Sequence, residues 1–356
     1  MYAAGVGTEK RNNSGKAGII AVILLLLLMA AVAGGYVFLQ KMGAPVNPES
    51  EEQIAVEIPS GSSTSAIGSI LESEGLIESA DQFRLKSKMA GNDGKYKAGV
   101  YELSPCMSIE EIMNILVEGK QKTISVTIPE GYTLKQIAQR VAESGACTAE
   151  EFLAETENGT FDFAYDDEMV SGSQRYEGFL FPDTYSIFEK ESAHSIIQMM
   201  LSRFEEVYQE ESAQASADSS QYSTFQLVTI ASLIEREAKL DEERPLVASV
   251  IYNRLDRGMK LQMCSTVQYA LGTPKARLLY SDLEVDSPYN TYKNAGLPAG
   301  PIASPGRASI RAALNPAQSD YLYFVLTETG SGKHNFAATG DDFSSYKEEY
   351  LASLAG

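Results

Sequence analysis

Several patterns are missing from this sequence, and each absence removes a class of function. Basic residues are outnumbered, with 29 Lys and Arg against 48 Asp and Glu, and the formal net charge is −19. Nucleic-acid binding needs a basic surface to meet the phosphates, so we set that function aside. The chain also has no phosphate-binding loop, no glycine-rich dinucleotide motif after a strand and no HExxH zinc motif.

Cysteine and histidine are scarce. The three cysteines, Cys106, Cys147 and Cys264, are an odd number, so they form no complete disulfide framework and we expect small buried thiols. The two histidines, His194 and His334, are far apart in the sequence. No group of Cys and His has the spacing of metal ligands, and we therefore expect neither a metal nor a cofactor.

One long apolar segment lies near the N-terminus. Residues 17–39, AGIIAVILLLLLMAAVAGGYVFL, contain no charge and are long enough to cross a bilayer core of about 30 Å as a helix. Basic residues at 10–16 precede it and acidic residues follow it, so the positive-inside rule places residues 1–16 in the cytoplasm and everything after residue 40 outside. A cleaved signal peptide is the alternative, but its apolar core is usually shorter. We expect an uncleaved anchor in the plasma membrane.

Composition divides the rest of the chain into four parts. Residues 40–53 carry Gly, two Pro and acidic residues, which is typical of a flexible linker. Residues 54–150 contain an internal repeat, 151–222 form a connecting region, and 223–356 hold the motifs that carry chemistry. The predicted class is α+β, with one transmembrane helix, repeated βα units and an α+β C-terminal domain.

The two copies of the repeat are separated by a constant offset of 70 residues. VEIPSGSSTSAIGSILESEGLI, from Val56, recurs as VTIPEGYTLKQIAQRVAESGAC, from Val126. Each copy predicts a strand, a Pro-x-Gly turn, a helix start at Ser or Thr, and an amphipathic helix that ends at Gly. A strand at 99–103 and a helix at 108–116 are predicted between the copies. These units resemble LysM modules, which bind glycan, although a full LysM has the order βααβ; a purely structural spacer is the alternative.

Two glutamates follow an apolar run at the start of the C-terminal domain. Glu235 comes directly after LVTIASLI at 227–234, and Glu237 lies two residues further on. On a helical wheel they flank opposite sides of the apolar face. Partial burial raises the pKa of a carboxyl group towards the range of a general acid, whereas charges on the rim of a helix have no such role. Periodicity alone does not choose between the two glutamates.

An ordered series of motifs surrounds these glutamates. After YEGFLFPDTY come ASLIEREA, RPLVASVIYNRL, GMKLQ, STVQYALG, SPYNTYKNAGLPAGPIASPG, ALNPA, YLYFV and HNF. With the apolar segment they resemble the endolytic murein transglycosylases of the MltG/YceG family, over nearly the whole chain. The resemblance implies a peptidoglycan lytic transglycosylase domain at 223–356. Its catalytic residue is then Glu235, the first glutamate of the family's E-K/R-E motif, and Glu237 has a supporting role.

The reaction that the resemblance implies needs one acid and no metal. The glutamic acid protonates the oxygen between MurNAc and GlcNAc and then takes the proton of the MurNAc C6 hydroxyl, which closes a 1,6-anhydro ring. Cleavage of nascent glycan strands near the membrane would end their elongation. The resemblance also implies peptidoglycan synthases of the elongation or division machinery as partners.

Polar residues in turn-rich segments after Glu235 are the predicted sugar contacts, because binding groups often lie in such segments. They are Gln262, Thr266, Asn290 and Tyr292. The alternative for Asn290 is that it only shapes a turn. Residues 296–306, GLPAGPIASPG, are too rich in Pro and Gly for a helix, and we expect a loop that lines a cleft or crosses the surface.

Two positions depart from the family pattern. Cys264 stands where the family often has Asp, so that Asp is not required here, and Phe343 stands where a final His is common. Two other functions stay open. A hydrolytic muramidase needs a second carboxylate facing Glu235, with Asp282, Glu284 and Asp286 as the nearest candidates. A non-enzymatic wall-binding or division scaffold would have an inert C-terminal domain.

Overall fold

The computed structural model describes most of the chain after the apolar segment. It covers residues 42–354 except 190, 217, 218, 274, 276 and 277, together with residues 22, 25–27 and 29. The predicted tail at 1–16 and most of the predicted anchor at 17–39 therefore lie outside the described residues. Among the helices that are described, none is long and apolar enough to cross a membrane.

Two compact units make up the chain, unit 1 (Met1–Lys122) and unit 2 (Thr123–Gly356), and each has its own hydrophobic core. Both combine helices with two-stranded sheets, which confirms the predicted α+β class. The boundary between the units falls within the predicted repeated βα units at 54–150, so the two copies of the repeat belong to different units. The reason is strand pairing: the strand of the second copy pairs with residues 184–188, which the sequence assigned to the connecting region.

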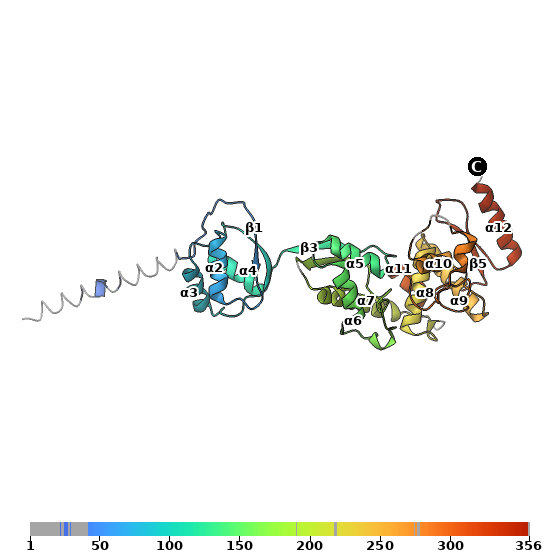
Figure 1. The fold of residues 1–356 in the computed structure, drawn as a ribbon, viewed down its shortest axis with the longest axis horizontal. Helices are drawn as coiled ribbons and strands as arrows, with labels where there is room; N and C mark the ends of the chain where they lie inside the picture. The colour runs from blue at the N-terminus through green and yellow to red at the C-terminus, as the bar shows by residue number, and fades with distance from the viewer. Residues whose placement is uncertain are drawn as a thin grey trace, which may run out of the picture. The chain divides into compact units, whose positions relative to one another are not determined.

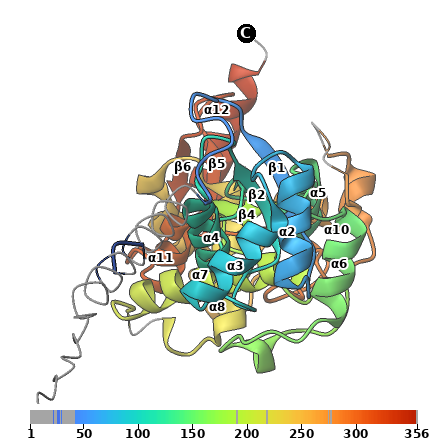
Figure 2. The ribbon, with the colours of Figure 1, turned by 90° about the vertical axis from the view of Figure 1, so that its left-hand side faces the viewer.

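Unit 1 consists of a strand pair covered by helices (Figure 1). Its elements are β1 (Ile54–Ile58), α2 (Thr64–Ser73), α3 (Ala80–Ala90), β2 (Gly99–Leu103) and α4 (Ile109–Glu118). The strands are antiparallel, and α3 lies between α2 and α4 (Figure 2). Val56 and Ile58 of β1 are buried and their neighbours are not, so only one face of the sheet is covered. The predicted strand at 99–103 and helix near 108–116 are confirmed as β2 and α4.

The first part of unit 2 has the same order of elements. It contains β3 (Thr123–Thr127), α5 (Leu134–Glu143), α6 (Ala149–Asn158), the 3-10 turn η1 (Asp166–Glu168) and β4 (Thr184–Phe188). The pairing register also repeats, since Val126 lies opposite Tyr185 as Val56 lies opposite Tyr101. Each tyrosine donates its hydroxyl to the backbone carbonyl four residues earlier. Residues 54–103 (copy 1) and 123–188 (copy 2) are therefore duplicated βααβ units.

Local signals explain where the first helix of each copy begins and ends. The Ser63 hydroxyl accepts a backbone N–H at the start of α2, and Thr133 forms a capping box with Gln136 at the start of α5. Gly75 and Gly145 follow these helices with φ of 71° and 81°, a left-handed conformation that costs glycine little. The predicted helix starts and stops are confirmed.

The rest of unit 2 is mainly helical and encloses one central helix. Its elements are α7 (Ala193–Ser212), α8 (Thr224–Glu237), η3 (Asp241–Glu243), α9 (Arg244–Asp256), α10 (Cys264–Leu271), η4 (Tyr280–Glu284), α11 (Arg307–Leu314), β5 (Tyr323–Leu326), β6 (His334–Ala337) and α12 (Gly340–Ser353). Helix α8 packs against α9, α10 and α11, and α7 packs against α6 and α11. The segment 296–306 contains no helix, as predicted.

Candidate active site

The C-terminal end of α8 is where two other helices begin. Helix α8 starts at Ser223, which forms a capping box with Gln226, and its residues 227–234 are all buried. This burial on every side corrects the one-sided apolar face expected from the helical wheel, because α9, α10 and α11 surround the helix. The last turn carries Glu235 and Glu237, which contact the first residues of α11 and α10 respectively.

One oxygen of Glu235 receives all of the hydrogen bonds that the structure gives this carboxylate. Its Oε2 accepts the Gly306 backbone N–H at 3.0 Å, the Ser309 hydroxyl at 2.8 Å and an Arg244 Nη1–H at 3.3 Å. Gly306 caps α11, so the carboxylate lies at the positive end of that helix dipole. No described residue donates to Oε1. The donors therefore fix the orientation of the carboxyl group and leave Oε1 available to carry a proton.

Arg244 connects Glu235 to the start of α9. Its side chain is 7% exposed, and its guanidinium donates from Nε to Asp241 at 2.9 Å and also contacts the Ser309 hydroxyl. A buried arginine needs such partners, because an unpaired buried charge is costly. The guanidinium thus joins α8, α9 and α11 around one carboxylate.

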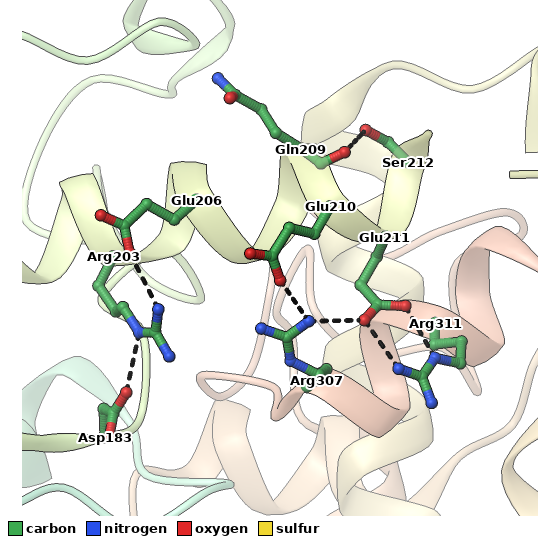
Figure 3. A network of polar contacts seen from close by, with 9 residues as sticks. All are labelled: Asp183, Arg203, Glu206, Gln209, Glu210, Glu211, Ser212, Arg307 and Arg311. Carbon is green, nitrogen blue, oxygen red and sulfur yellow. Dashed lines mark hydrogen bonds and ion pairs between the residues drawn. The ribbon is translucent and has the colours of Figure 1, made fainter. Parts of the chain in front are cut away.

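Helix α11, which supplies two of the donors, is held by an ionic network with α7 (Figure 3). Glu211 is 8% exposed and accepts Arg307 at 2.9 Å and Arg311 Nε at 2.8 Å, and Arg307 also pairs with Glu210 at 2.7 Å. Arg311, and to a lesser extent Arg307, lower the pKa of Glu211. The network fixes the first turn of α11 and so the positions of Gly306 and Ser309.

The turn between β3 and α5 also reaches this site. The Gly131 N–H donates to the Ser304 carbonyl at 2.9 Å, and the Ser304 N–H donates to the Tyr132 carbonyl at 2.8 Å. Arg236 Nη1 donates to the Gly131 carbonyl at 3.2 Å. The Pro-x-Gly turn of copy 2 is therefore bonded to the loop that leads into α11 and to the end of α8.

A second carboxylate, missed from the sequence, lies at the tip of this turn. A Cβ added to Gly306 would meet Glu130 Oε1 at 1.9 Å, so the Glu130 carboxylate rests on the glycine that donates to Glu235. Partial burial raises the pKa of Glu130, the charge of Glu235 raises it further, and Arg244 opposes the shift. The sequence contained one signal for Glu130: at this position of the repeat, copy 1 has Ser60 and copy 2 has a glutamate.

Comparison with known proteins fits this architecture. The model of the YceG-like family matches residues 56–349. The chain belongs to the YceG-like family. A crystal structure of a YceG-like protein of Listeria monocytogenes has a TM-score of 0.55 and 39% sequence identity, and the match covers 83% of this chain and 99% of that one.

Two curated proteins with similar sequences are named endolytic murein transglycosylase. The protein of Bacillus subtilis (strain 168) is 36% identical over 337 residues, which cover 90% of this chain and 91% of that protein. The protein of Streptococcus pneumoniae serotype 2 (strain D39 / NCTC 7466) is 36% identical over 346 residues, and the match covers 90% of this chain and 62% of that longer protein. The family resemblance expected from the sequence motifs is thus confirmed.

Glu237, predicted as a supporting residue, has a different neighbourhood from Glu235. Its Oε1 accepts the Ser265 hydroxyl at 2.6 Å, at the N-terminus of α10. Burial is the main cause that raises the pKa of Glu237, against hydrogen bonds from Ser265. Next to it, Cys264 lies with its thiol 3.1 Å from the Tyr292 hydroxyl, and it is exposed, which corrects the buried thiol expected from the sequence. In this YceG-like chain Glu237 therefore secures α10.

The four predicted sugar contacts fall into two groups. Thr266 and Asn290 are fully buried, and their side chains bond within the protein: Thr266 to the Met263 carbonyl at 2.7 Å, and Asn290 to two carbonyls of η4 and the loop after it, each at 2.8 Å. These internal bonds stabilise the loops that carry the two residues, and a sugar contact by either residue remains untested. Gln262 is exposed, and Tyr292 is half-buried beside Cys264. A sugar contact stays a prediction for Gln262 and Tyr292.

Gln262 has an unusual backbone. Its φ is 54°, the one positive value among the described residues other than glycine, and its N–H donates to the Thr291 carbonyl at 3.2 Å. A long side chain rarely adopts this conformation, and such strain is often found at functional sites. The backbone strain at Gln262 is consistent with the predicted sugar contact, which stays a prediction.

The acidic residues proposed as a second catalytic carboxylate have other partners. Asp282 accepts Lys275 Nζ at 2.5 Å and the Leu279 N–H at 2.8 Å, which lower its pKa. Asp286 is exposed with Lys293 at 3.8 Å, and Glu284 is exposed. Among the described residues, no contact joins any of these three acidic residues to Glu235. Glu130, in contrast, contacts Gly306, whose N–H donates to Glu235.

The histidines each pair with a glutamate. His334 Nδ1 lies 2.7 Å from Glu243 Oε2 and its N–H donates to Glu243 Oε1 at 3.0 Å, in a buried pair that joins β6 to η3. His194 Nδ1 lies 2.8 Å from Glu155 on the surface. Within the described residues, no three His, Cys, Asp or Glu side chains are grouped as a metal site.

A cavity of about 430 Å³ lies at the other end of α8. Glu235 does not line it. Its lining residues are Tyr222, Phe225, Gln226, Thr229, Leu255, Leu297 and Pro298. The loop 296–306 thus begins at this cavity and ends at Gly306, beside Glu235.

Proposed function

We propose that this chain is an endolytic peptidoglycan lytic transglycosylase, an enzyme that cleaves the MurNAc–GlcNAc bond inside glycan strands. Membership of the YceG-like family and the relatives named endolytic murein transglycosylase support the reaction class. One observation carries the assignment to a residue: Glu235 accepts three donors on Oε2, and no described residue bonds to Oε1.

This arrangement suits a general acid. Oε1 gives its proton to the oxygen of the breaking glycosidic bond, and the three donors on Oε2 stabilise the carboxylate that remains. The C6 hydroxyl of the same MurNAc then attacks its anomeric carbon and closes a 1,6-anhydro ring. An attacker within the same sugar has an effective molarity on the order of 10⁵ M or more, so no bound water is needed.

The reaction takes place at the outer face of the plasma membrane. Residues 17–39 act as an uncleaved anchor with residues 1–16 in the cytoplasm, which keeps the enzyme near the newest glycan strands. Cleavage there ends strand elongation, and peptidoglycan synthases of the elongation or division machinery are the proposed partners. The βααβ order of both copies supports the LysM-like interpretation, in which these units hold the glycan strand.

A hydrolytic muramidase is the second candidate, and one observation favours it. Hydrolysis by a glycosidase uses two carboxylates, and Glu130 lies beside Glu235. The two enzymes differ in the attacking group, which is a water for the muramidase and the C6 hydroxyl for the transglycosylase.

Mass spectrometry of the products tests the proposal. Purified uncrosslinked glycan strands are digested with the protein, and the new chain ends are weighed. We expect 1,6-anhydro-MurNAc ends, lighter by one water than reducing ends, and cuts within chains as well as at their termini. Mainly reducing ends would establish the muramidase, and no cleavage by folded protein would favour the non-enzymatic scaffold.

A further inference from the structure

Closing the anhydro ring releases a proton from the attacking hydroxyl, and some group must accept it. In a mechanism with a single residue, Glu235 Oε1, the oxygen without a described donor, would first protonate the leaving sugar and then accept this second proton. A second base near Glu235 would divide the two proton transfers between two groups.

Glu130 has the position for this role. Its carboxylate contacts Gly306, and the Gly306 N–H donates to Glu235 at 3.0 Å. The path from Glu130 Oε1 through the Gly306 backbone to Glu235 Oε2 is about 8 Å long with standard bond lengths, so the two carboxylates lie no further apart than this. A sugar ring that reaches Glu235 Oε1 is therefore within reach of Glu130.

The Glu130 carboxylate is also unpaired among the described residues, so it can accept a proton. It makes no hydrogen bond or ion pair with any residue that the structure describes, and it remains open to solvent at the tip of its turn. Burial and the charge of Glu235 both raise its pKa above the ordinary value of 4.5. Each effect strengthens a base, because each favours the protonated product of the transfer.

The turn that carries Glu130 is rigid at its other positions. Gly131 bonds through its N–H to Ser304 and through its carbonyl to Arg236, so the backbone at Glu130 is fixed to the loop before α11 and to α8. In copy 1 the matching residue is Ser60, and nothing lies within 4 Å of a Cβ built on the next residue, Gly61. A carboxylate occurs only in the copy whose turn meets Glu235.

We propose that Glu130 is a second catalytic residue, which takes the proton of the attacking hydroxyl while Glu235 protonates the leaving oxygen. The bond from the MurNAc anomeric carbon to the GlcNAc oxygen breaks, and the bond to O6 forms. One proton moves from Glu235 to the leaving oxygen and one from O6 to Glu130. Glu130 then loses its proton to solvent and Glu235 regains one, which restores the starting state. This inference rests on the proposed function.

The test compares Glu130→Gln, Glu130→Asp and Glu130→Ala with the full-length protein on uncrosslinked glycan strands, and Ser60→Ala is the matched control. We expect Glu130→Gln to lower kcat/KM by about 100-fold or more, the usual contribution of general base catalysis. The base must be ionised, so wild-type activity should fall as pH decreases through the raised pKa of Glu130. Glu130→Gln should lose this acidic limb, and Glu130→Asp should keep it.

Chemical rescue separates a base from a structural residue. Formate added to Glu130→Ala should restore cleavage at least about tenfold, since a small carboxylate can occupy the space of the missing one. A rate for Glu130→Gln within twofold of wild type would overturn the proposal. So would a slow variant that keeps the acidic limb and does not respond to formate. Failure of the proposed function is distinct, because it appears in the wild-type product as reducing ends.

Discussion

The two copies of the βααβ unit have the same fold and different surroundings. Both pair a Val of the first strand with a Tyr of the last, and both Tyr hydroxyls bond to the carbonyl four residues earlier. The Pro-x-Gly turn of copy 1 is exposed, whereas that of copy 2 is bonded to the loop before α11 and to α8. The comparison shows that the same fold carries two different turns, and that only the turn of copy 2 is bonded to the segments around Glu235.

A second difference lies in the loop before the last strand. Asp93 in copy 1 accepts the hydroxyl of Thr64, the first residue of α2, and remains exposed. Glu177 in copy 2 accepts the N–H of Leu134, the first residue of α5, at 2.9 Å, and also the Tyr269 hydroxyl at 2.9 Å. The same link between loop and helix is thus at the surface in one copy and buried in the other.

The largest loss of cleavage activity is expected from a change at the end of α8, which the turn of copy 2 contacts. Glu235→Gln should lower the cleavage rate by at least about 100-fold, because an amide cannot donate the proton that the leaving oxygen needs. Glycan cleavage and thermal unfolding of the purified variant provide the measurement. Glu237→Gln is the control and should be milder, since Glu237 bonds to α10. Full turnover by folded Glu235→Gln would remove Glu235 from the mechanism.

A smaller loss of activity should distinguish the Pro-x-Gly turn of copy 2 from that of copy 1. Gly131 and Gly61 have φ of 75° and 76°, so valine at either position is strained by a similar amount, about 1–2 kcal/mol. Only at Gly131 does a Cβ approach Glu235 and Arg236, at 3.8 and 3.5 Å, and the methyl groups beyond it would displace them.

Gly131→Val should therefore lose about tenfold or more in cleavage rate, since small displacements of catalytic groups have effects of this size. Gly61→Val should keep the wild-type rate despite a similar loss of stability. Equal activity of the two variants, measured on the same glycan strands, would contradict the difference between the turns.

The last expected effect is on stability and not on activity, and it concerns Glu177. Burial raises its pKa to about 7, from an ordinary value of 4.5, despite hydrogen bonds that lower it. The folded state then binds more protons than the unfolded state between these values, so unit 2 should lose stability as pH rises from about 4.5 to about 7, by roughly 3 kcal/mol. Glu177→Gln should flatten this dependence and raise stability at pH 8.

Denaturant unfolding of unit 2 from pH 4.5 to 8 checks this prediction. Asp93→Asn, at the equivalent exposed position in copy 1, should leave the pH dependence of unit 2 unchanged. An unaltered slope in Glu177→Gln would mean that other groups cause it.

The sequence predicted the parts of this fold that local signals determine. The first helix of each copy, its start at Ser63 or Thr133 and its glycine stop were all found from the pattern. The second helices, α3 and α6, were missed because each buries only one aromatic residue and one hydroxyl. Their shared spacing, Phe83 with Ser87 and Phe152 with Thr156, was a usable signal.

The candidate site was predictable only in part. The motifs identified Glu235, but its donors Gly306, Ser309 and Arg244 come from three later segments, and no local pattern specifies such contacts. Glu130 was missed for the same reason, since its neighbour Gly306 lies far along the chain. Thr266 and Asn290 were polar residues in turns, and only the folded structure distinguishes a buried loop bond from a binding group.

The most direct test of the account is the activity of unit 2 alone. Unit 2 contains its own hydrophobic core, copy 2, Glu235 and all of the described partners of Glu235. Residues 123–356, expressed without unit 1, should cut uncrosslinked glycan strands in solution at a rate within a few-fold of the full-length protein, with the same chain ends by mass spectrometry. A folded unit 2 that cuts no glycan, beside an active full-length protein, would contradict the claim that copy 2 and not copy 1 builds the site.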